Sequence, residues 1–230
     1  MDKKRIWEVD ALRFIAIILM LIYHLVFDLK EYLNVDVNYE EFHWYIIGIS
    51  SAIIFMFISG VSSGLSKNPI KRGVQVLACG MLVTLVSFIF FKDMYIRFGI
   101  LHFLGVCMII SPALRKMDNL TLLLIGLACV ITGIYIENIT INIPYLLPLG
   151  FKYRGFHSFD YYPLIPYLSV YILGILVFRN YYKERKSIFK KELYSNFIRK
   201  ISEKSLFIYL IHQPIYYALI LLYKYVFSSL

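Results

Sequence analysis

Apolar residues fall into seven long runs along the chain, separated by shorter polar segments. Each run holds roughly 17 to 25 residues, which is the length an α-helix needs to cross the hydrocarbon core of a bilayer. The runs cover residues 11–29, 44–65, 74–91, 98–114, 120–136, 163–178 and 205–227. The pattern therefore predicts an all-α membrane protein, a polytopic bundle of about seven transmembrane helices.

The composition agrees with a chain whose solvent is lipid. Hydrophobic residues make up 60% of the 230 positions, more than a soluble domain carries. The first run lacks a small-residue cleavage site and contains His24, so we expect a permanent helix rather than a signal peptide. No internal repeat or low-complexity segment divides the chain, which predicts one transmembrane domain over residues 1–230. The three cysteines lie inside apolar runs, and no residues have the spacing of a metal site.

The formal charge of +9 is explained by membrane topology rather than by nucleic-acid binding. Positive residues stay on the cytoplasmic side, and with a cytoplasmic N-terminus most of the 24 Lys and Arg residues fall in inner segments. The inner segment 179–204 is basic and amphipathic, which is typical of contact with anionic lipid or phosphate. The outer segment 30–43 is acidic, and the outer segment 137–162, rich in Pro and Gly, is expected to fold back over the helices.

Four ionisable side chains lie inside the predicted spans. They are Arg13 and His24 in the first span, His102 in the fourth and His212 in the seventh. An ionisable group in the membrane costs several kcal/mol, so a functional role is the default interpretation. The alternative is that these groups only form hydrogen bonds between helices.

The first span carries a candidate base. Arg13 and His24 are separated by about 20° around the helix and about 16 Å along it, so they share one face. Asp28 lies one turn beyond His24 and is expected to accept the imidazole N–H, which would fix the tautomer. A neutral imidazole in an apolar bundle can then take a proton from an attacking amine or hydroxyl. Bridging of helices by His24 stays open as the alternative.

Further polar residues lie at the predicted outer ends of the helices. Arg97, His43, His157 and Asp160 would meet there, at the level of His102, and form a polar vestibule that binds an acceptor. A solvated loop position is the alternative for each of them. Asp160 precedes a Pro-rich helix start, so its carboxylate is also a candidate cap for that helix.

Two other segments are candidates for ligand contact. In His212-Gln213-Pro214 the proline removes a backbone hydrogen bond and frees carbonyls. The side chains of His212 and Gln213 can satisfy these carbonyls or contact a ligand. Small residues at 60–64 precede Lys71 and Arg72 on the inner side. They allow either close helix packing or the approach of a phosphate-bearing ligand.

The segment Asp10-Ala-Leu-Arg13, followed ten residues later by His24, resembles the arginine-to-histidine signature of transmembrane acyltransferases. The rest of the chain looks more like one branch, the bacterial relatives of heparan-alpha-glucosaminide N-acetyltransferase. That resemblance rests on the segments 23–28, 57–62, 97–105, 160–166 and 205–214.

The resemblance implies a multi-pass enzyme of a bacterial plasma membrane. It would take an acetyl or similar acyl group from cytoplasmic acetyl-CoA, its co-substrate, and deliver it to an amine or hydroxyl of a sugar or glycan outside. His24 would be the base and Asp28 its orienter, while His102, Arg97 and Asp160 would place the acceptor or stabilise the oxyanion. Arg13 would lie beside the acyl-CoA channel, and His212 and Gln213 would contact the acyl-CoA. Transfer to nitrogen or oxygen, a covalent intermediate and homodimerisation stay open.

Three alternatives remain at this point. In the lysosomal relative the proposed catalytic histidine follows the first helix, where this chain has His43, so His43 competes with His24 as the base. A small-molecule or lipid transporter would use the intramembrane histidines as a proton relay, although no inverted repeat is present. A receptor-like or assembly scaffold would need neither histidine for its function.

Overall fold

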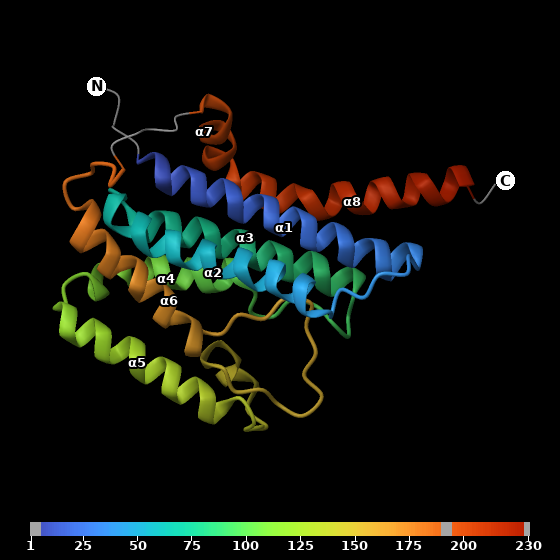
Figure 1. The fold of residues 1–230 in the computed structure, drawn as a ribbon. Coiled ribbons are helices and arrows are strands. Elements are labelled where there is room, and N and C mark those ends of the chain that lie inside the picture. Colours follow the sequence, from blue (N-terminus) through green and yellow to red (C-terminus); the bar gives the residue numbers. More distant parts are fainter. Residues whose placement is uncertain (1–5, 190–194, 228–230) are drawn as a thin grey trace. The chain divides into compact units, whose positions relative to one another are not determined.

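The chain is built from helices, and no strand occurs in the part of the chain that the structure describes. The computed structural model describes residues 6–189 and 195–227. Its elements are α1 (Trp7–Leu33), α2 (Phe42–Leu65), α3 (Pro69–Phe90), α4 (Ile100–Leu114), α5 (Asn119–Ile136), η1 (Pro144–Leu149), α6 (Leu164–Val177), η2 (Phe178–Tyr182), α7 (Asn196–Glu203) and α8 (Ser205–Phe227), as Figure 1 shows.

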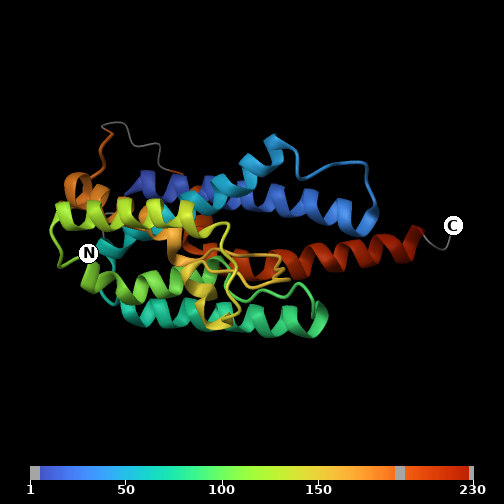
Figure 2. The same ribbon diagram turned by 90° about the horizontal axis from the view of Figure 1, so that it is seen from below.

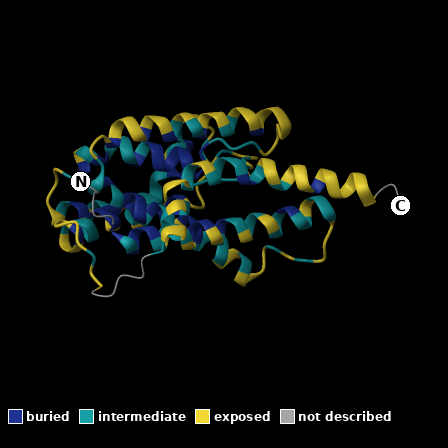
Figure 3. Cartoon of the chain, turned by 90° about the horizontal axis from the view of Figure 1, so that it is seen from above, coloured by how far each residue is buried: buried dark blue, intermediate teal, exposed yellow. Residues whose placement is uncertain are grey.

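The predicted membrane helices are present. Over the described residues, six helices are long and apolar enough to cross a membrane, and α4, with 15 residues, is a shorter apolar helix. They correspond to the seven predicted runs, so the prediction of a polytopic helical bundle is confirmed. Exposed apolar side chains follow α3, α5 and α8 (Figure 3), as expected of surfaces that face lipid. The basic residues Lys3, Lys4 and Arg5, used to orient the bundle, lie outside the described residues.

The chain divides into two compact units. Unit 1 comprises residues 56–188, which include the second half of α2, α3 to α6, η1 and η2. Unit 2 comprises the described residues of 5–55 and 189–230, which include α1, the first half of α2, α7 and α8. The prediction of one functional domain over the whole chain stays a prediction.

In unit 1 the helices pack as antiparallel neighbours. Gly73 of α3 lies against Ile109 of α4, and Gly80 lies against His102, so α3 and α4 run in opposite directions (Figure 2). Helices α5 and α6 are also antiparallel, because Gly133 meets Pro166 while residues nearer the start of α5 meet residues further along α6. The segments 66–68, 115–118 and 178–182 therefore lie at one end of unit 1, and the loops 91–99 and 137–163 at the other.

Helices α2 and α6 approach each other through glycines. A Cβ added to Gly60 would collide with the backbone carbonyl of Tyr171, and one added to Gly174 would collide with the carbonyl of Phe57. Only a residue without a side chain permits this separation. Of the two interpretations for the small residues at 60–64, close helix packing is therefore the one found.

In unit 2, α7 and α8 pack on α1. Contacts advance together along α1 and α8, from His24 with His212 to Tyr32 with Tyr217, so both helices run in the same direction. The first and last of seven spans must run in the same direction, so this arrangement agrees with the predicted number of spans. Helix α8 continues through Pro214 without ending there.

The long loop after α5 returns to the helices of unit 1. Its short helix η1 packs against α6, and Leu147 of η1 is buried. The hydroxyl of Tyr161 donates a hydrogen bond to the carbonyl of Leu147 at 2.8 Å. The loop thus folds back over this end of the unit, as the sequence predicts.

Candidate active site

Two histidines from different helices meet inside unit 2. The rings of His24 on α1 and His212 on α8 have centroids 4.8 Å apart and lie nearly perpendicular, at 82°. The hydroxyl of Tyr216 donates to the carbonyl of Leu21 at 3.2 Å and holds α8 against α1 at this level. His212 is buried, and His24 is half-buried.

Hydrogen bonds determine the tautomer of each ring. Nδ1 of His24 lies 2.9 Å from the carbonyl of Met20, and Nδ1 of His212 lies 2.6 Å from the carbonyl of Tyr209. A carbonyl only accepts, so each Nδ1 carries the proton and each Nε2 of a neutral ring holds a lone pair. Nε2 of His212 is buried and has no hydrogen-bond partner among the described residues. The two rings thus offer two basic nitrogens within one small region.

Asp28 does not hold the His24 ring as predicted. The imidazole N–H is donated to the carbonyl of Met20 on the preceding turn, which lies within reach of Nδ1. Asp28 instead forms a side-chain hydrogen bond with Gln213 of α8. Its carboxylate is buried, and Oδ2 lacks a partner among the described residues. The prediction of this contact is therefore wrong, because the imidazole N–H bonds a backbone carbonyl and the Asp28 carboxylate bonds Gln213.

Arg13 belongs to a polar network where α7 meets α1. Its Nη1 donates to Oγ of Ser202 at 3.0 Å and lies 3.6 Å from a carboxylate oxygen of Asp10. The Ser202 hydroxyl donates to that same oxygen at 2.7 Å. Arg13 and His24 therefore both face helices that pack on α1, as their spacing along the helix predicts. A contact of Arg13 with acyl-CoA stays a prediction.

His102 lies in unit 1 and has both ring nitrogens occupied. Nδ1 accepts from the backbone N–H of Gly99 at 3.2 Å, which caps the first turn of α4. Nε2–H then donates to Oγ1 of Thr84 at 3.1 Å, and the threonine hydroxyl donates to the carbonyl of Ile96 at 2.7 Å. These bonds give His102 a role in positioning α3, α4 and the loop between them.

Asp160 caps a helix, but not the one that follows it in the sequence. Its Oδ2 accepts the backbone N–H of Ile100 at 2.9 Å, at the start of α4. Gly99 lies so close that a Cβ there would collide with the carboxylate. Burial raises the pKa of Asp160 to about 6, although the hydrogen bond from Ile100 opposes this shift. The predicted cap on the helix after Pro163 is thus replaced by a cap on α4, because the chain reversal brings the loop back to that helix.

Arg97 joins the loops 91–99 and 137–163 of unit 1. Its Nη1 donates to the carbonyl of His157 at 2.7 Å, and its guanidinium lies 4.0 Å from the ring centre of Tyr95 and 5.4 Å from that of Phe156. His157 contributes its backbone to this contact, and its residue is exposed. The aromatic residues of these loops therefore enclose a cation from the chain itself.

The remaining predicted residues are exposed. His43 lies at the start of α2 in unit 2, with Nδ1 3.6 Å from a carboxylate oxygen of Glu41. Lys71 and Arg72, in the first turn of α3, line a cavity of about 330 Å³ in unit 1 together with Lys67. Arg97, His102, Asp160 and the His157 backbone lie together within unit 1, whereas His43, which the sequence predicts among them, belongs to unit 2. A role of these residues in binding an acceptor stays a prediction.

Sequence reasoning did not detect the basic partnership between His24 and His212, since it treated His212 as a ligand-binding residue. The sequence does show a second histidine in an apolar span. That this histidine lies at the level of His24 depends on how α8 packs on α1, which the sequence pattern does not indicate. It also gave no role to Arg115 and Lys116 beyond the charge of the inner side, and it treated Arg179 only as part of the basic segment 179–204.

The chain matches the family model described as the catalytic domain of heparan-alpha-glucosaminide N-acetyltransferase, and the match covers residues 5–214. This range contains His24, Asp28, His102, Asp160, His212 and Gln213, whereas Tyr216 lies just beyond it. No curated protein and no solved structure matches the chain with significance.

Proposed function

Since the chain belongs to the heparan-alpha-glucosaminide N-acetyltransferase family of multi-pass membrane acetyltransferases, we propose that it acetylates an extracytoplasmic sugar or glycan. The donor is cytoplasmic acetyl-CoA or a similar acyl-CoA, and the acceptor is an amine or hydroxyl. The observation that carries this proposal is the His24–His212 pair, whose Nε2 atoms are free to accept protons.

His24 acts as the general base. Its Nε2 lone pair takes the proton of the acceptor amine or hydroxyl while the acceptor attacks the thioester carbonyl of acyl-CoA. A new C–N or C–O bond forms, the C–S bond breaks, and the proton passes from His24 to the departing thiolate. His24 returns to its neutral form. The Nδ1–H bond to Met20 holds the ring in this tautomer throughout.

His212 supplies a second proton acceptor beside the first. Its buried Nε2 has no hydrogen-bond partner in the described residues. It gains one when the amine or hydroxyl of the sugar enters the region between the rings, or when His24 becomes protonated. The neighbouring bond between Gln213 and Asp28 sets the register of α8 on α1. We therefore assign Asp28 and Gln213 a positioning role, in which they keep the two rings together.

In unit 1, the cluster of Arg97, His102 and Asp160 is assigned to acceptor binding. His102 and Asp160 position the start of α4, and Arg97 ties together the loops that carry aromatic side chains. Exposed His43 and His157 are available at the surface for contact with a sugar acceptor. The distribution of positive residues puts His43 and His157 on the extracytoplasmic side and Lys71 and Arg72 on the cytoplasmic side, where the donor binds.

The test measures thiol release from acetyl-CoA by the purified full chain in detergent, with glucosamine or glucose as the acceptor. The wild type is expected to release CoA in the presence of at least one of them. His24→Gln should reduce kcat by about 10²- to 10⁴-fold, the usual contribution of a general base. The matched His43→Gln variant examines the rival base under the same conditions.

Three outcomes decide the proposal. Loss of activity in His43→Gln with retention in His24→Gln would transfer the base to His43. Label retained on the wild-type protein from radioactive acetyl-CoA without acceptor, and absent from His24→Gln, would show a covalent route through the same lone pair. A folded wild type that neither binds nor turns over any acyl-CoA, but takes up solute into proteoliposomes, would favour the transporter.

A further inference from the structure

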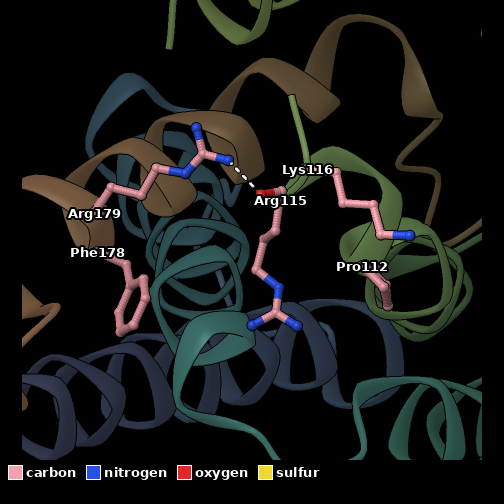
Figure 4. A pocket seen from close by; sticks show the side chains of 5 residues that line it. All are labelled: Pro112, Arg115, Lys116, Phe178 and Arg179. Carbon is pink, nitrogen blue, oxygen red and sulfur yellow. Dashed lines mark hydrogen bonds between the residues drawn. The ribbon is translucent and has the colours of Figure 1, made fainter. Parts of the chain in front are cut away.

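A basic cavity lies in unit 1 where α4 ends and α6 continues into η2. Its volume is about 400 Å³, and it is lined by Pro112, Arg115, Lys116, Phe178 and Arg179. Figure 4 shows that the three cations come from two separate parts of the chain, and that Arg179 meets the backbone of Arg115 while the charged ends of Arg115 and Lys116 point in other directions. Cavities of about 300 Å³ or more are large enough for small ligands. None of these residues has a role in the site described above.

Arg179 is held in place by two hydrogen bonds. Its Nη2 donates to the backbone carbonyl of Arg115 at 2.6 Å, and its Nη1 donates to Oδ1 of Asn119 at 2.9 Å (Figure 4 shows the first). A guanidinium has five N–H donors, so most remain available to a ligand. The bonds also fix the orientation of the group before a ligand arrives, which lowers the entropic cost of binding.

Arg115 carries a buried donor without an acceptor. Its Nε is inaccessible to solvent and has no hydrogen-bond partner among the described residues. The cavity lining contains no carboxylate, and the nearby Asp118 uses its carboxylate on Thr121. Within the described chain no ion pair neutralises Arg115, Lys116 or Arg179. An anionic ligand in the cavity would offset the positive charge of this lining.

We propose that this cavity binds a phosphate monoester, namely the 3′-phosphate at the adenosine end of the acyl-CoA donor. This inference rests on the proposed function. A phosphate monoester carries close to two negative charges and three acceptor oxygens, whereas a phospholipid diester carries one charge. Three cations and the planar donor set of two arginines suit the dianion. Phe178 and Pro112 supply the apolar wall that an adenine ring requires.

The second basic cavity in unit 1 is less suited to this task. Its cations, Lys67, Lys71 and Arg72, are all exposed and lie at or just before the start of α3. In the described residues no hydrogen bond holds their side chains in place. The cavity at Arg115 and Arg179 is thus the preorganised site, and Arg72 serves as the rival in the test.

The experiment compares the binding of coenzyme A and of dephospho-coenzyme A, which lacks the 3′-phosphate, to the full chain in detergent by titration calorimetry. The wild type should bind coenzyme A about 10- to 100-fold more tightly, because charge-assisted hydrogen bonds are lost with the phosphate. Arg179→Gln should weaken coenzyme A binding to the dephospho level and leave dephospho-coenzyme A unchanged. Lys186→Gln removes a cation that is paired with Glu184 at 2.8 Å, and should change neither affinity.

A second variant and a lipid competition keep the inference testable if Arg179→Gln fails to fold. Lys116→Gln alters only an exposed side chain and should reduce the preference for coenzyme A by several-fold. The preference should also survive phosphatidylglycerol in the micelles.

Each contrary result has a distinct meaning. Competition by phosphatidylglycerol would mean that the cavity holds a lipid headgroup and would overturn the inference. Loss of the preference in Arg72→Gln, with retention in Arg179→Gln and Lys116→Gln, would overturn it in favour of the second cavity. A folded wild type that binds neither coenzyme would instead contradict the proposed function.

Discussion

Unit 1 and unit 2 each contain a histidine inside an apolar helix, and the two histidines differ in what their nitrogens do. His102 in unit 1 accepts a bond from Gly99 and donates one to Thr84, so its capacity for hydrogen bonds is used within the protein. His24 in unit 2 uses Nδ1–H on its own helix and, among the described residues, leaves Nε2 without a hydrogen bond.

The difference separates a structural histidine from a reactive one. Both are ionisable groups in predicted membrane spans, where burying such a group costs free energy that some structural or functional role must offset. For His102, with both nitrogens hydrogen-bonded, the structural role is sufficient. For His24, which has a free lone pair beside a second such ring, hydrogen bonding within the protein does not account for the residue. The comparison therefore predicts chemistry at His24 and His212 and stability at His102.

The largest effect is expected in unit 2, from a double-mutant cycle on His24→Gln and His212→Gln. Each single variant should lower kcat, and His24→Gln should do so by about 10²- to 10⁴-fold. Because the two rings act on one proton, the double variant should be little worse than His24→Gln alone. Initial rates of CoA release measure this. Strictly additive losses would show that the rings act independently.

The next effect is expected in unit 1, from His102→Leu. This change leaves the Gly99 N–H without its acceptor and removes the partner of Thr84, so the free energy of unfolding should fall by about 2–4 kcal/mol. Thermal unfolding in detergent measures the loss, with Thr84→Val as a smaller matched change. The activity of the remaining folded molecules should stay within a few-fold of wild type. A loss as large as that in His24→Gln would make His102 catalytic.

A pH effect on stability is expected from Asp160 of unit 1. The folded pKa of Asp160, about 6, exceeds the ordinary value of 3.8, so the protonated carboxyl is favoured by the fold. The contribution to stability is complete below about pH 4 and is lost as the pH rises through 6. Asp160→Asn keeps an acceptor for the Ile100 N–H but cannot ionise.

We therefore expect the melting temperature of the wild type to fall between pH 4 and pH 7 by more than that of Asp160→Asn. Asp160→Ala, which loses the cap, should be less stable than Asp160→Asn at every pH. Parallel melting curves for wild type and Asp160→Asn across this range would show that Asp160 ionises with its ordinary pKa.

The smallest effect is expected from Arg97→Lys. The positive charge remains, but the bond to the His157 carbonyl and the planar contact with Tyr95 are weakened, at a cost of about 0.5–1 kcal/mol. Protease sensitivity of the loops 91–99 and 137–163 should increase, while the rate of CoA release changes less than twofold. A large loss of activity without a change in loop sensitivity would indicate that Arg97 contacts the acceptor directly.

The helices themselves could be predicted closely, and the errors lie at charged ends. The last span, 205–227, has the bounds of α8, and 44–65 differs from α2 by two residues at one end. Helix α1 begins at Trp7 rather than at residue 11, since Glu8 and Asp10 are favourable in the first turn of a helix. Helix α3 begins at Pro69 rather than at residue 74, because proline is favoured at a helix start. A hydropathy pattern omits such turns.

The candidate site could be predicted in its residue types but not in its contacts. His24, His102 and His212 are identified by the cost of an ionisable group in lipid. Which of them retains a free nitrogen depends on nearby carbonyls and hydroxyls. The Met20 carbonyl bonds His24 and the Thr84 hydroxyl bonds His102. Residue spacing along the helix favours Asp28 as the partner of His24 and does not indicate either of these groups.

The sequence by itself determined that this protein is a helical membrane protein, because apolar runs of about 20 residues satisfy their backbone in lipid as helices. It also determined the acetyltransferase family, through the family match over residues 5–214. Only the tertiary structure decided that His212 faces His24, that Asp160 caps α4 and that Arg115 and Arg179 share a cavity. These pairs are 60 or more residues apart in the chain. Their meeting depends on helix register and close packing, which no local pattern encodes.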